Sequence, residues 1–296
     1  MRGQIGSFYK LFYTLDIFTS YWIDYGVEKA WGSRLVARQW QIPIGVQLLP
    51  AGLLGLGMFT LKESVRWLTA EGRHEEAWRS LQWIRADSSA ATETEMEEIR
   101  AGAEQESRER EGFSFKELYA PWSHLKRVIT AVAIFTAQQA TGATAIAYFG
   151  PQYFKLLIGN DQTRSLLLTG IFGAVKVAAC GTFVFFVAEN INRKQILIWG
   201  AAFMAVCQIT TAAVVTDVPR PASGDITSGG IATVALIYLF VIAYNFSWGP
   251  LPWPFVSEIF PTRIREPGIA IGVSSQWLFN FVFSVATPYM ITNLGW

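Results

Sequence analysis

Long apolar stretches separated by short polar ones dominate the chain. A helix that crosses the hydrocarbon core of a bilayer needs about 20 mostly apolar residues. Seven stretches approach this length, at residues 6–23, 42–61, 128–150, 165–188, 195–216, 230–256 and 268–291. The first is the least apolar because it contains Lys10 and Asp16. The pattern predicts an all-α, polytopic membrane helix bundle with about seven transmembrane helices.

The segment at residues 62–127 differs from the rest because it holds a large share of the ionic side chains. Within it, "GRHEEAWRSLQWIR" spaces Ala77, Leu81 and Ile84 as one face of an amphipathic helix. "TETEMEEIRAGAEQESRER" predicts a second, solvated helix, and "FSFKELY" a short third one near the membrane surface. A flexible charged linker is the alternative.

Basic residues in the loops predict the orientation of the chain. Eleven Lys and Arg lie in residues 62–127, and two each lie in the short turns at 189–194 and 257–267. Because loops rich in Lys and Arg stay in the cytoplasm, these three segments are predicted to face it.

Composition and charge support a membrane protein and exclude other classes. Only 16% of residues are charged and 51% are hydrophobic, whereas soluble domains carry roughly 25% charge. The net charge of +1 gives no reason to expect nucleic acid. Cys180 and Cys207 lie in apolar runs, so neither a disulfide framework nor a metal site is expected. We also expect no cofactor and no enzyme activity, because the chain shows no phosphate loop, metal-ligand spacing or nucleophile–base pair. No signal peptide is visible at its start.

One apolar stretch ends in "SWGPLPWPFVSEIFPTRIREPG", residues 247–268. Its prolines at positions 250, 252 and 254 remove three N–H donors and prevent a straight helix. Inside lipid such a break is tolerated only where the freed backbone groups face protein or a water-filled cavity. The stretch therefore predicts a hinge beside a polar cavity; a kinked packing helix is the alternative.

Four stretches, in order and at plausible spacing, resemble motifs of the sugar porter family of the major facilitator superfamily. They are "KESVRWL" (62–68), "QQATGATAIAYFGPQYF" (138–154), "AENINRK" (188–194) and "GPLPWPFVSEIFPTRIR" (249–265). "SYWIDYG", "IPIGVQLLPAGLL" and "GAVK" look closest to fungal-type quinate and monosaccharide permeases.

The resemblance also implies how the chain is organised. Arg2-Gly3 matches the end of the loop before the family's fifth helix. Residues 1–61 would then hold helices five and six, 62–127 a cytoplasmic amphipathic linker, and 128–296 helices seven to eleven. Without the first four helices and the twelfth, we expect a shortened gene product or a partial gene model.

The resemblance further implies a binding site for a small polyhydroxylated substrate. The candidate residues are Gln138, Gln139, Thr144, Tyr148, Trp253, Gln276, Asn280, Lys176 and Lys10. Amide side chains both donate and accept, which suits a polyol, although Gln138 and Gln139 could instead join helices. Trp253 could stack on a sugar ring; an interfacial tryptophan belt is the alternative, and it fits Trp248 better. Thr144 stands where the family usually has Asn.

The two lysines in this set allow several interpretations. Lys176 lies midway along an apolar stretch, and an intramembrane cation is a functional candidate. It could attract a carboxylate such as that of quinate, pair with Asp16 or with an acidic residue outside this chain, or extend towards the membrane surface. Lys10 stands where many family members carry a ligand-binding Gln, which indicates an anionic ligand or a damaged site.

Charged residues at the predicted cytoplasmic ends form a second candidate site. In the family such residues make a salt-bridge lattice that latches the two halves; here they are Glu63, Arg66, Glu189, Arg193, Glu258, Arg263 and Arg265. Pairs of this kind contribute about 1 kcal/mol or less each, which suits a reversible latch. His74 and His124 are expected to have no role in proton transfer.

The sequence therefore favours a secondary transporter of a monosaccharide or quinate-like polyol acid, working by alternating access. Proton coupling is implied only by the resemblance. An inactive remnant and a transporter-like sugar sensor remain as alternatives. The expected location is a multi-pass position in the plasma membrane. The expected partners are the bilayer and the substrate, and the resemblance adds protons as a coupling ion.

Overall fold

The computed structural model describes residues 2–32, 36–158, 161–187, 192–217 and 228–294. Within these ranges the regular structure is helical, which confirms the all-α prediction. The helices that form the bundle are α1 (Arg2–Trp31), α2 (Arg38–Met58), α6 (Trp122–Ala140), α7 (Ala143–Ile158), α8 (Gln162–Thr182), α9 (Arg193–Asp217), α10 (Ser228–Phe246), α11 (Pro252–Ile259) and α12 (Thr262–Leu294). A π-helical turn, Phe183–Val187, extends α8.

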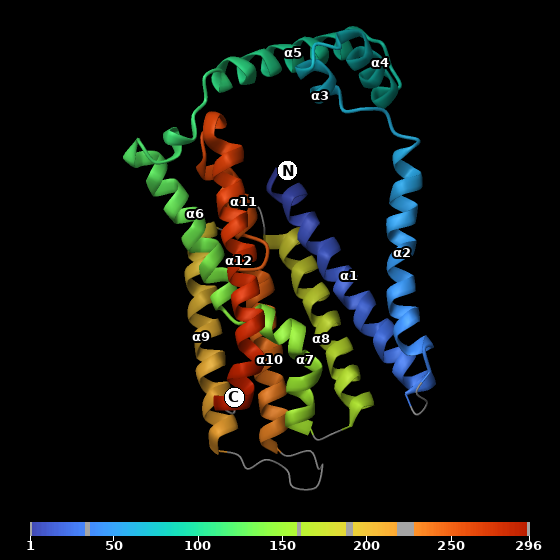
Figure 1. Ribbon diagram of the computed structural model, residues 1–296, viewed down its shortest axis with the longest axis vertical. Coiled ribbons are helices and arrows are strands. Elements are labelled where there is room, and N and C mark those ends of the chain that lie inside the picture. The colour runs from blue at the N-terminus through green and yellow to red at the C-terminus, as the bar shows by residue number, and fades with distance from the viewer. Residues whose placement is uncertain (1, 33–35, 159–160, 188–191, 218–227, 295–296) are drawn as a thin grey trace.

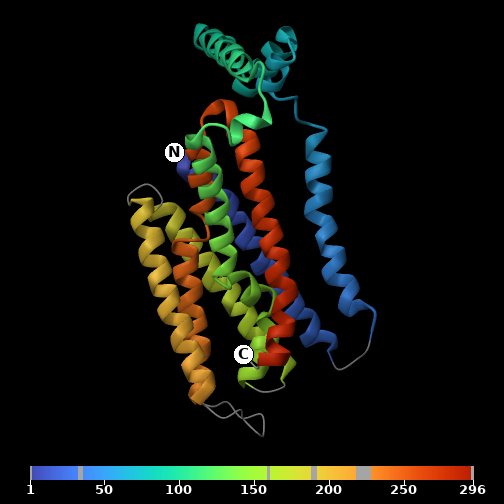
Figure 2. The ribbon, with the colours of Figure 1, turned by 60° about the vertical axis from the view of Figure 1, so that its left-hand side comes forward.

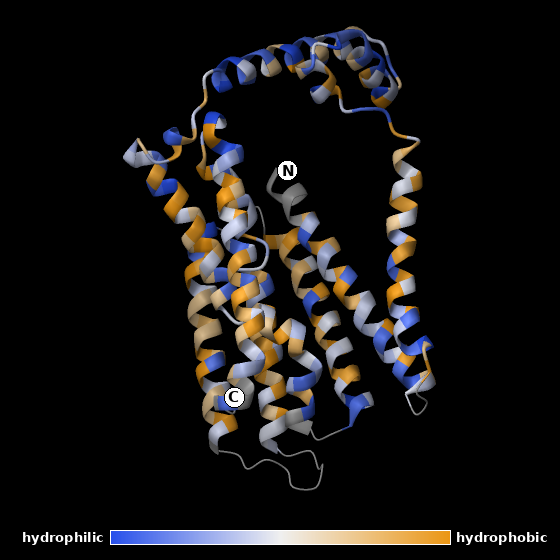
Figure 3. Cartoon of the chain, viewed as in Figure 1, coloured by the Kyte–Doolittle hydropathy of each residue, from blue (hydrophilic) through white to orange (hydrophobic). Residues whose placement is uncertain are grey.

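The bundle helices run side by side, and a smaller helical layer crosses one end of them (Figure 1). This layer contains α3 (Val65–Ala70), α4 (His74–Arg85), α5 (Ala90–Arg110) and the 3₁₀ turn η1 (Phe115–Leu118). Hydrophilic residues concentrate there, whereas hydrophobic residues prevail along the bundle (Figure 3). The helices predicted in the charged segment are thus present.

Five described helical segments are long and apolar enough to cross a membrane: α2, α8 with its π turn, α9, α10 and α12. Two of the predicted spans, 6–23 and 128–150, are not among them. Span 6–23 lies within α1 and carries Lys10 and Asp16. Span 128–150 is divided between α6 and α7, so neither helix holds the whole apolar run.

α2 stands apart from the other bundle helices and packs mainly against α1 (Figure 2). It has no buried residue, and its apolar side chains are exposed all around it. The remaining bundle helices share two main cores. One joins α7, α8, α9 and α10 around Phe154, Phe172 and Phe240. The other joins α6, α11, α12 and η1 around Phe135, Phe260 and Ile264.

Glycines let α1 and α8 approach closely. A Cβ at Gly173 would lie 3.2 Å from the Cα of Phe18, and one at Gly170 would lie 3.3 Å from the ring of Trp22. Contacts this short are tighter than a Cβ usually makes, so Phe18 and Trp22 would have to shift to admit one. The glycines therefore let the two helices pack closely along this face.

Two helix breaks interrupt the bundle. Between α6 and α7, Gly142 has a φ of +81°, in the left-handed region that favours glycine. Between α10 and α11, residues 247–251 form turns, and the N–H of Gly249 donates to the carbonyl of Tyr244 at 2.7 Å. The break predicted from the prolines is thus confirmed, and Thr141-Gly142 adds a second one.

Candidate functional site

Gln138, near the end of α6, connects the two breaks. Its side-chain nitrogen donates to the carbonyl of Trp248 at 2.6 Å and to that of Gly249 at 3.4 Å. These carbonyls lie at the α10–α11 break, where the usual helical donors are missing. Gln138 is only 2% exposed, so its side-chain N–H takes the place of the backbone donors that these two carbonyls lack at the break.

Gln139 is hydrogen-bonded to two other predicted substrate residues. Its side-chain oxygen accepts the hydroxyl of Thr144 at 2.7 Å and the amide nitrogen of Asn280 at 3.4 Å. The three side chains come from α6, α7 and α12. The structure thus brings Gln139, Thr144 and Asn280 into one polar cluster, hereafter the Gln139 cluster.

Trp253, on α11, lies beside the same part of α6. Its ring meets that of Phe135, one turn before Gln139, edge to face at 5.2 Å between centroids. The Trp253 ring also lies 6.2 Å, centroid to centroid, from that of the exposed Tyr9 of α1. Trp248 does not fit the predicted interfacial belt. It packs against the bundle core, and its indole N–H donates to the carbonyl of Leu197 at 3.0 Å.

Several buried acceptors near these residues lack a partner among the described residues. They are the side-chain oxygens of Thr136, Gln138, Asn245, Gln276 and Ser284. Buried polar atoms are normally hydrogen-bonded, so unpaired ones mark places where a hydroxyl-bearing ligand or water can bind. Thr136, Asn245 and Ser284 are not among the residues expected from the sequence, although each is a polar residue within an apolar run, a signal that could have found them.

The remaining substrate candidates lie on the α1 side of the bundle. Tyr148 of α7 is 52% exposed and lies next to the Ala147 carbonyl, which accepts the Tyr21 hydroxyl of α1 at 2.6 Å. Lys10 and Lys176 lie on the packed helices α1 and α8. Within the described ranges, neither forms an ion pair, and Asp16 is exposed, so the alternative Lys176–Asp16 pair is not present.

The charged residues predicted to form one latch are distributed over separate contacts. Arg193 pairs with Glu258, joining α9 to α11. The Nε of Arg265 donates to the Phe260 carbonyl at 3.4 Å. Glu63 lies just before α3 and Arg66 lies within it. This helix contacts α4 and α5. Glu189 lies outside the described residues.

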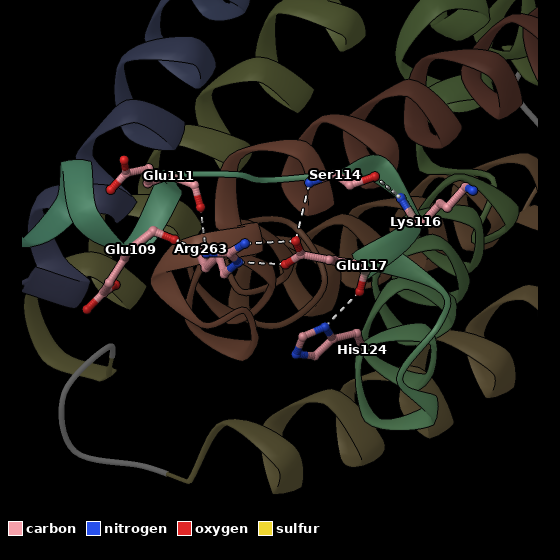
Figure 4. Close-up of polar contacts among 7 residues, drawn as sticks. All are labelled: Glu109, Glu111, Ser114, Lys116, Glu117, His124 and Arg263. Carbon is pink, nitrogen blue, oxygen red and sulfur yellow. Dashed lines mark hydrogen bonds and ion pairs between the residues drawn. The ribbon is translucent and has the colours of Figure 1, made fainter.

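Arg263, at the start of α12, holds the α5–η1 connection instead of Glu258 (Figure 4). Two of its nitrogens donate to the Glu117 carboxylate, at 2.6 and 2.8 Å. A third donates to the carbonyls of Glu109 at 2.6 Å and Glu111 at 3.2 Å. Nearby, Arg110 of α5 pairs with Glu266 of α12 at 2.6 Å. These contacts dock the end of α5 on α12, and we call them the α5–α12 dock.

Glu117 is held in place from both sides. The Arg263 guanidinium lowers the pKa of this carboxyl to about 2, helped by the backbone N–H of Ser114. Ser114 forms a capping box with Glu117 at the start of η1. The carbonyl of Glu117 is hydrogen-bonded to Nδ1 of His124 at 2.8 Å. His124 therefore has a structural contact here.

Comparison with known proteins identifies the family. A family model described as "Sugar (and other) transporter" matches residues 1–296. The chain belongs to this family. The motif resemblance to sugar porters of the major facilitator superfamily is thereby confirmed, and the apolar helices make the chain part of a multi-pass membrane protein.

Curated relatives align with this sequence over nearly its whole length. The quinate permease of Emericella nidulans is 34% identical over 306 residues, covering 100% of this chain and 57% of the permease. A probable quinate permease of Aspergillus fumigatus is 35% identical over 303 residues, covering 99% and 55%. The chain thus spans little more than half the length of these relatives.

Solved structures share the fold. The proton:xylose symporter XylE bound to 6-bromo-6-deoxy-D-glucose matches with a TM-score of 0.75 and 25% identity, covering 99% of this chain and 58% of XylE. An inward-open conformation of the xylose transporter XylE from E. coli gives a TM-score of 0.74 at 25% identity, covering 99% and 57%.

Proposed function

We propose that the protein to which this chain belongs is a secondary transporter that moves a monosaccharide or a quinate-like polyol acid by alternating access. The observation that carries the proposal is the Gln139 cluster, formed at the α6–α7 break, which the neighbouring Gln138 ties to the α10–α11 break. Broken helices at the centre of a bundle are where transporters of several folds bind their substrates. The family and the names of the relatives agree with this reading.

The substrate would be held by amides, hydroxyls and aromatic rings. The side-chain oxygens of Gln138 and Gln276 are buried and have no hydrogen-bond partner among the described residues, so they can accept sugar hydroxyls. A substrate hydroxyl can also replace the 3.4 Å contact between Asn280 and Gln139, the longer of the two in the Gln139 cluster. Trp253 and Tyr148 are partly exposed and offer ring faces to the apolar side of a sugar ring.

Movement would depend on the two breaks and on the cytoplasmic contacts. Gly142 and residues 247–251 allow the halves of each broken helix to change angle without losing regular hydrogen bonds elsewhere. The Arg193–Glu258 pair and the α5–α12 dock join different helices at the cytoplasmic end. Exposed ion pairs contribute about 0–1 kcal/mol, so they can open and close during a cycle. Proton coupling extends the proposal by analogy with the proton:xylose symporter. We also propose a plasma-membrane location, as expected from the sequence.

A binding experiment tests the proposal most directly. We would purify the chain in detergent and measure binding of xylose, glucose and quinate by calorimetry, then repeat it with Gln139→Leu and Asn280→Leu. Gln47→Leu is the matched control, because Gln47 is exposed on α2. We expect at least one of the three compounds to bind, and both cluster variants to lose about tenfold or more in affinity while the control does not.

Counterflow in proteoliposomes then separates the alternatives. Exchange of labelled ligand supports a transporter. Binding without exchange favours a sensor-like or inactive protein, and binding that survives both cluster variants contradicts the proposed site.

A further inference from the structure

The direction of α7 is not fixed by the helix before it. Gly142, with its φ of +81°, separates α7 from α6. α7 carries Thr144 of the Gln139 cluster and the exposed Tyr148, two of the residues proposed to hold the substrate. Because a left-handed residue ends the regular hydrogen bonding of α6, contacts with other helices have to set the angle of α7.

A proline interrupts α7 itself. Pro151 lies inside the helix and has no N–H. In a regular helix an N–H at this position would donate to the carbonyl four residues earlier, which is that of Ala147. The interior of a membrane offers no water to an unpaired carbonyl. The carbonyl of Ala147 therefore needs a donor from outside α7.

That donor is Tyr21 of α1, whose hydroxyl donates to the Ala147 carbonyl at 2.6 Å. α1 itself packs on α8, and α8 packs on α7 (Figure 1). The Tyr21 ring lies against Gly173 of α8, where an added Cβ would be 3.1 Å from the Cδ2 atom of the ring. A side chain at position 173 would crowd the ring, so the glycine helps the hydroxyl to reach the backbone of α7.

α8 adds a second hydroxyl to the same part of α7. The buried Ser165 of α8 donates to the carbonyl of Pro151. The region around the proline is thus attached to α1 by Tyr21 and to α8 by Ser165.

From these contacts we infer that Tyr21 is a positioning residue of the substrate site. Its hydroxyl replaces the N–H that Pro151 lacks and thereby holds α7 in place against α1. It acts through Ala147, which lies directly before Tyr148 and three residues after Thr144. The inference rests on the proposed function, and it adds that a movement of α1 is passed to the substrate site through this hydrogen bond.

The test is a double-mutant cycle between Tyr21→Phe and Pro151→Ala. Tyr21→Phe removes only the hydroxyl, whereas Pro151→Ala restores an N–H for the Ala147 carbonyl. The binding of xylose, glucose and quinate to each purified variant is measured by calorimetry, and its melting temperature by thermal unfolding.

We expect Tyr21→Phe alone to weaken the affinity for the bound compound about fivefold or more and to lower the melting temperature by about 2–4 °C. In the Pro151→Ala background the same substitution should change the affinity about twofold or less, because the carbonyl then has a donor within its own helix.

Tyr238→Phe is the matched control. The Tyr238 hydroxyl of α10 donates to the Leu168 carbonyl of α8 at 2.9 Å, so this variant also loses one tyrosine hydrogen bond inside the bundle, but not one made to α7. It should lower the melting temperature by a similar amount and change the affinity about twofold or less.

A lower melting temperature without a loss of affinity in Tyr21→Phe would overturn the inference and leave the proposed function intact, since the hydrogen bond would then serve stability alone. An equal loss of affinity with and without Pro151→Ala would also overturn it, because the effect would not depend on the carbonyl that the proline frees. Binding of none of the three compounds by the wild type would overturn the proposed function together with the positioning role.

Discussion

Gln138 offers the sharpest test of how the breaks are stabilised. The substitution Gln138→Leu keeps a similar side-chain volume in a site that is 2% exposed. It removes the donor to the carbonyls of Trp248 and Gly249, at 2.6 and 3.4 Å. Those carbonyls remain at a helix break, and Pro252, four residues after Trp248, has no N–H to replace the lost donor.

The expected loss follows from the cost of an unpaired buried acceptor, about 1–3 kcal/mol. Part of it is offset, because the substitution also removes the Gln138 side-chain oxygen, for which the described part of the chain offers no hydrogen-bond donor within reach. A net loss of about 1–2 kcal/mol in the free energy of unfolding remains. For a chain of this size that corresponds to a melting temperature lower by about 2–8 °C.

Thermal unfolding of the purified chain in detergent, followed by tryptophan fluorescence, measures this change. Gln47→Leu on α2 is the control and should leave the melting temperature unchanged, since its amide is exposed. Gln138→Glu should be at least as destabilising, because an ionised carboxylate cannot donate to the two carbonyls.

If Gln138→Leu melts like the wild type while ligand affinity collapses, the amide serves the ligand and not the break, and the reasoning is refuted.

Gly142→Ala should lower the free energy of unfolding by about 1 kcal/mol, because its φ of +81° strains any residue with a Cβ. A Cβ there meets nothing closer than the Gln208 side chain at 3.7 Å, so Gly142→Asn, which tolerates this backbone better, should cost less; equal losses in chemical unfolding would indicate a clash instead. Arg263→Gln should release the α5–α12 dock, seen as faster hydrogen exchange at residues 109–118, and unchanged exchange would show that other contacts hold it. The pKa of Glu117 is about 2 in the folded chain and near 4.5 otherwise, so its contribution to the dock is fully present above about pH 4.5 and is lost only as the pH falls towards 2. Exchange at residues 109–118 should therefore be insensitive to this group between pH 5 and 8; a loss of protection at pH 5 to 6 would contradict the assignment.

The local features of the fold were predictable from the sequence. Apolar length predicted α2, α8, α9, α10 and α12, helical spacing predicted α4, and the cluster of prolines predicted the α10–α11 break. These features depend on a few neighbouring residues, whose backbone preferences act wherever the helix is placed.

Partnerships between distant residues were not predictable in the same way. Arg263 is paired with Glu117, 146 positions away, and not with the nearby Glu258. Gln138 uses its donor on the backbone 110 positions away, and Trp248 turns its indole into the bundle. Periodicity shows which face a residue occupies, but the packing of helices decides what that face meets. One candidate pair, Lys176 with Asp16, was wrong for this reason, since Lys176 is buried in the bundle and Asp16 is exposed.

The α5–α12 dock has a mechanical consequence. The crossing layer is tied to α12 at one end and continues through α3 into α2 at the other, while α2 itself packs mainly on α1 (Figure 1). The 21 residues of α5 form a rod about 31 Å long that can neither stretch nor shorten without unwinding. The α5–α12 dock therefore limits how far the α1–α2 side and the α12 side can move relative to each other. A movement larger than the short connecting loops can accommodate requires Arg263 to release the end of α5 first.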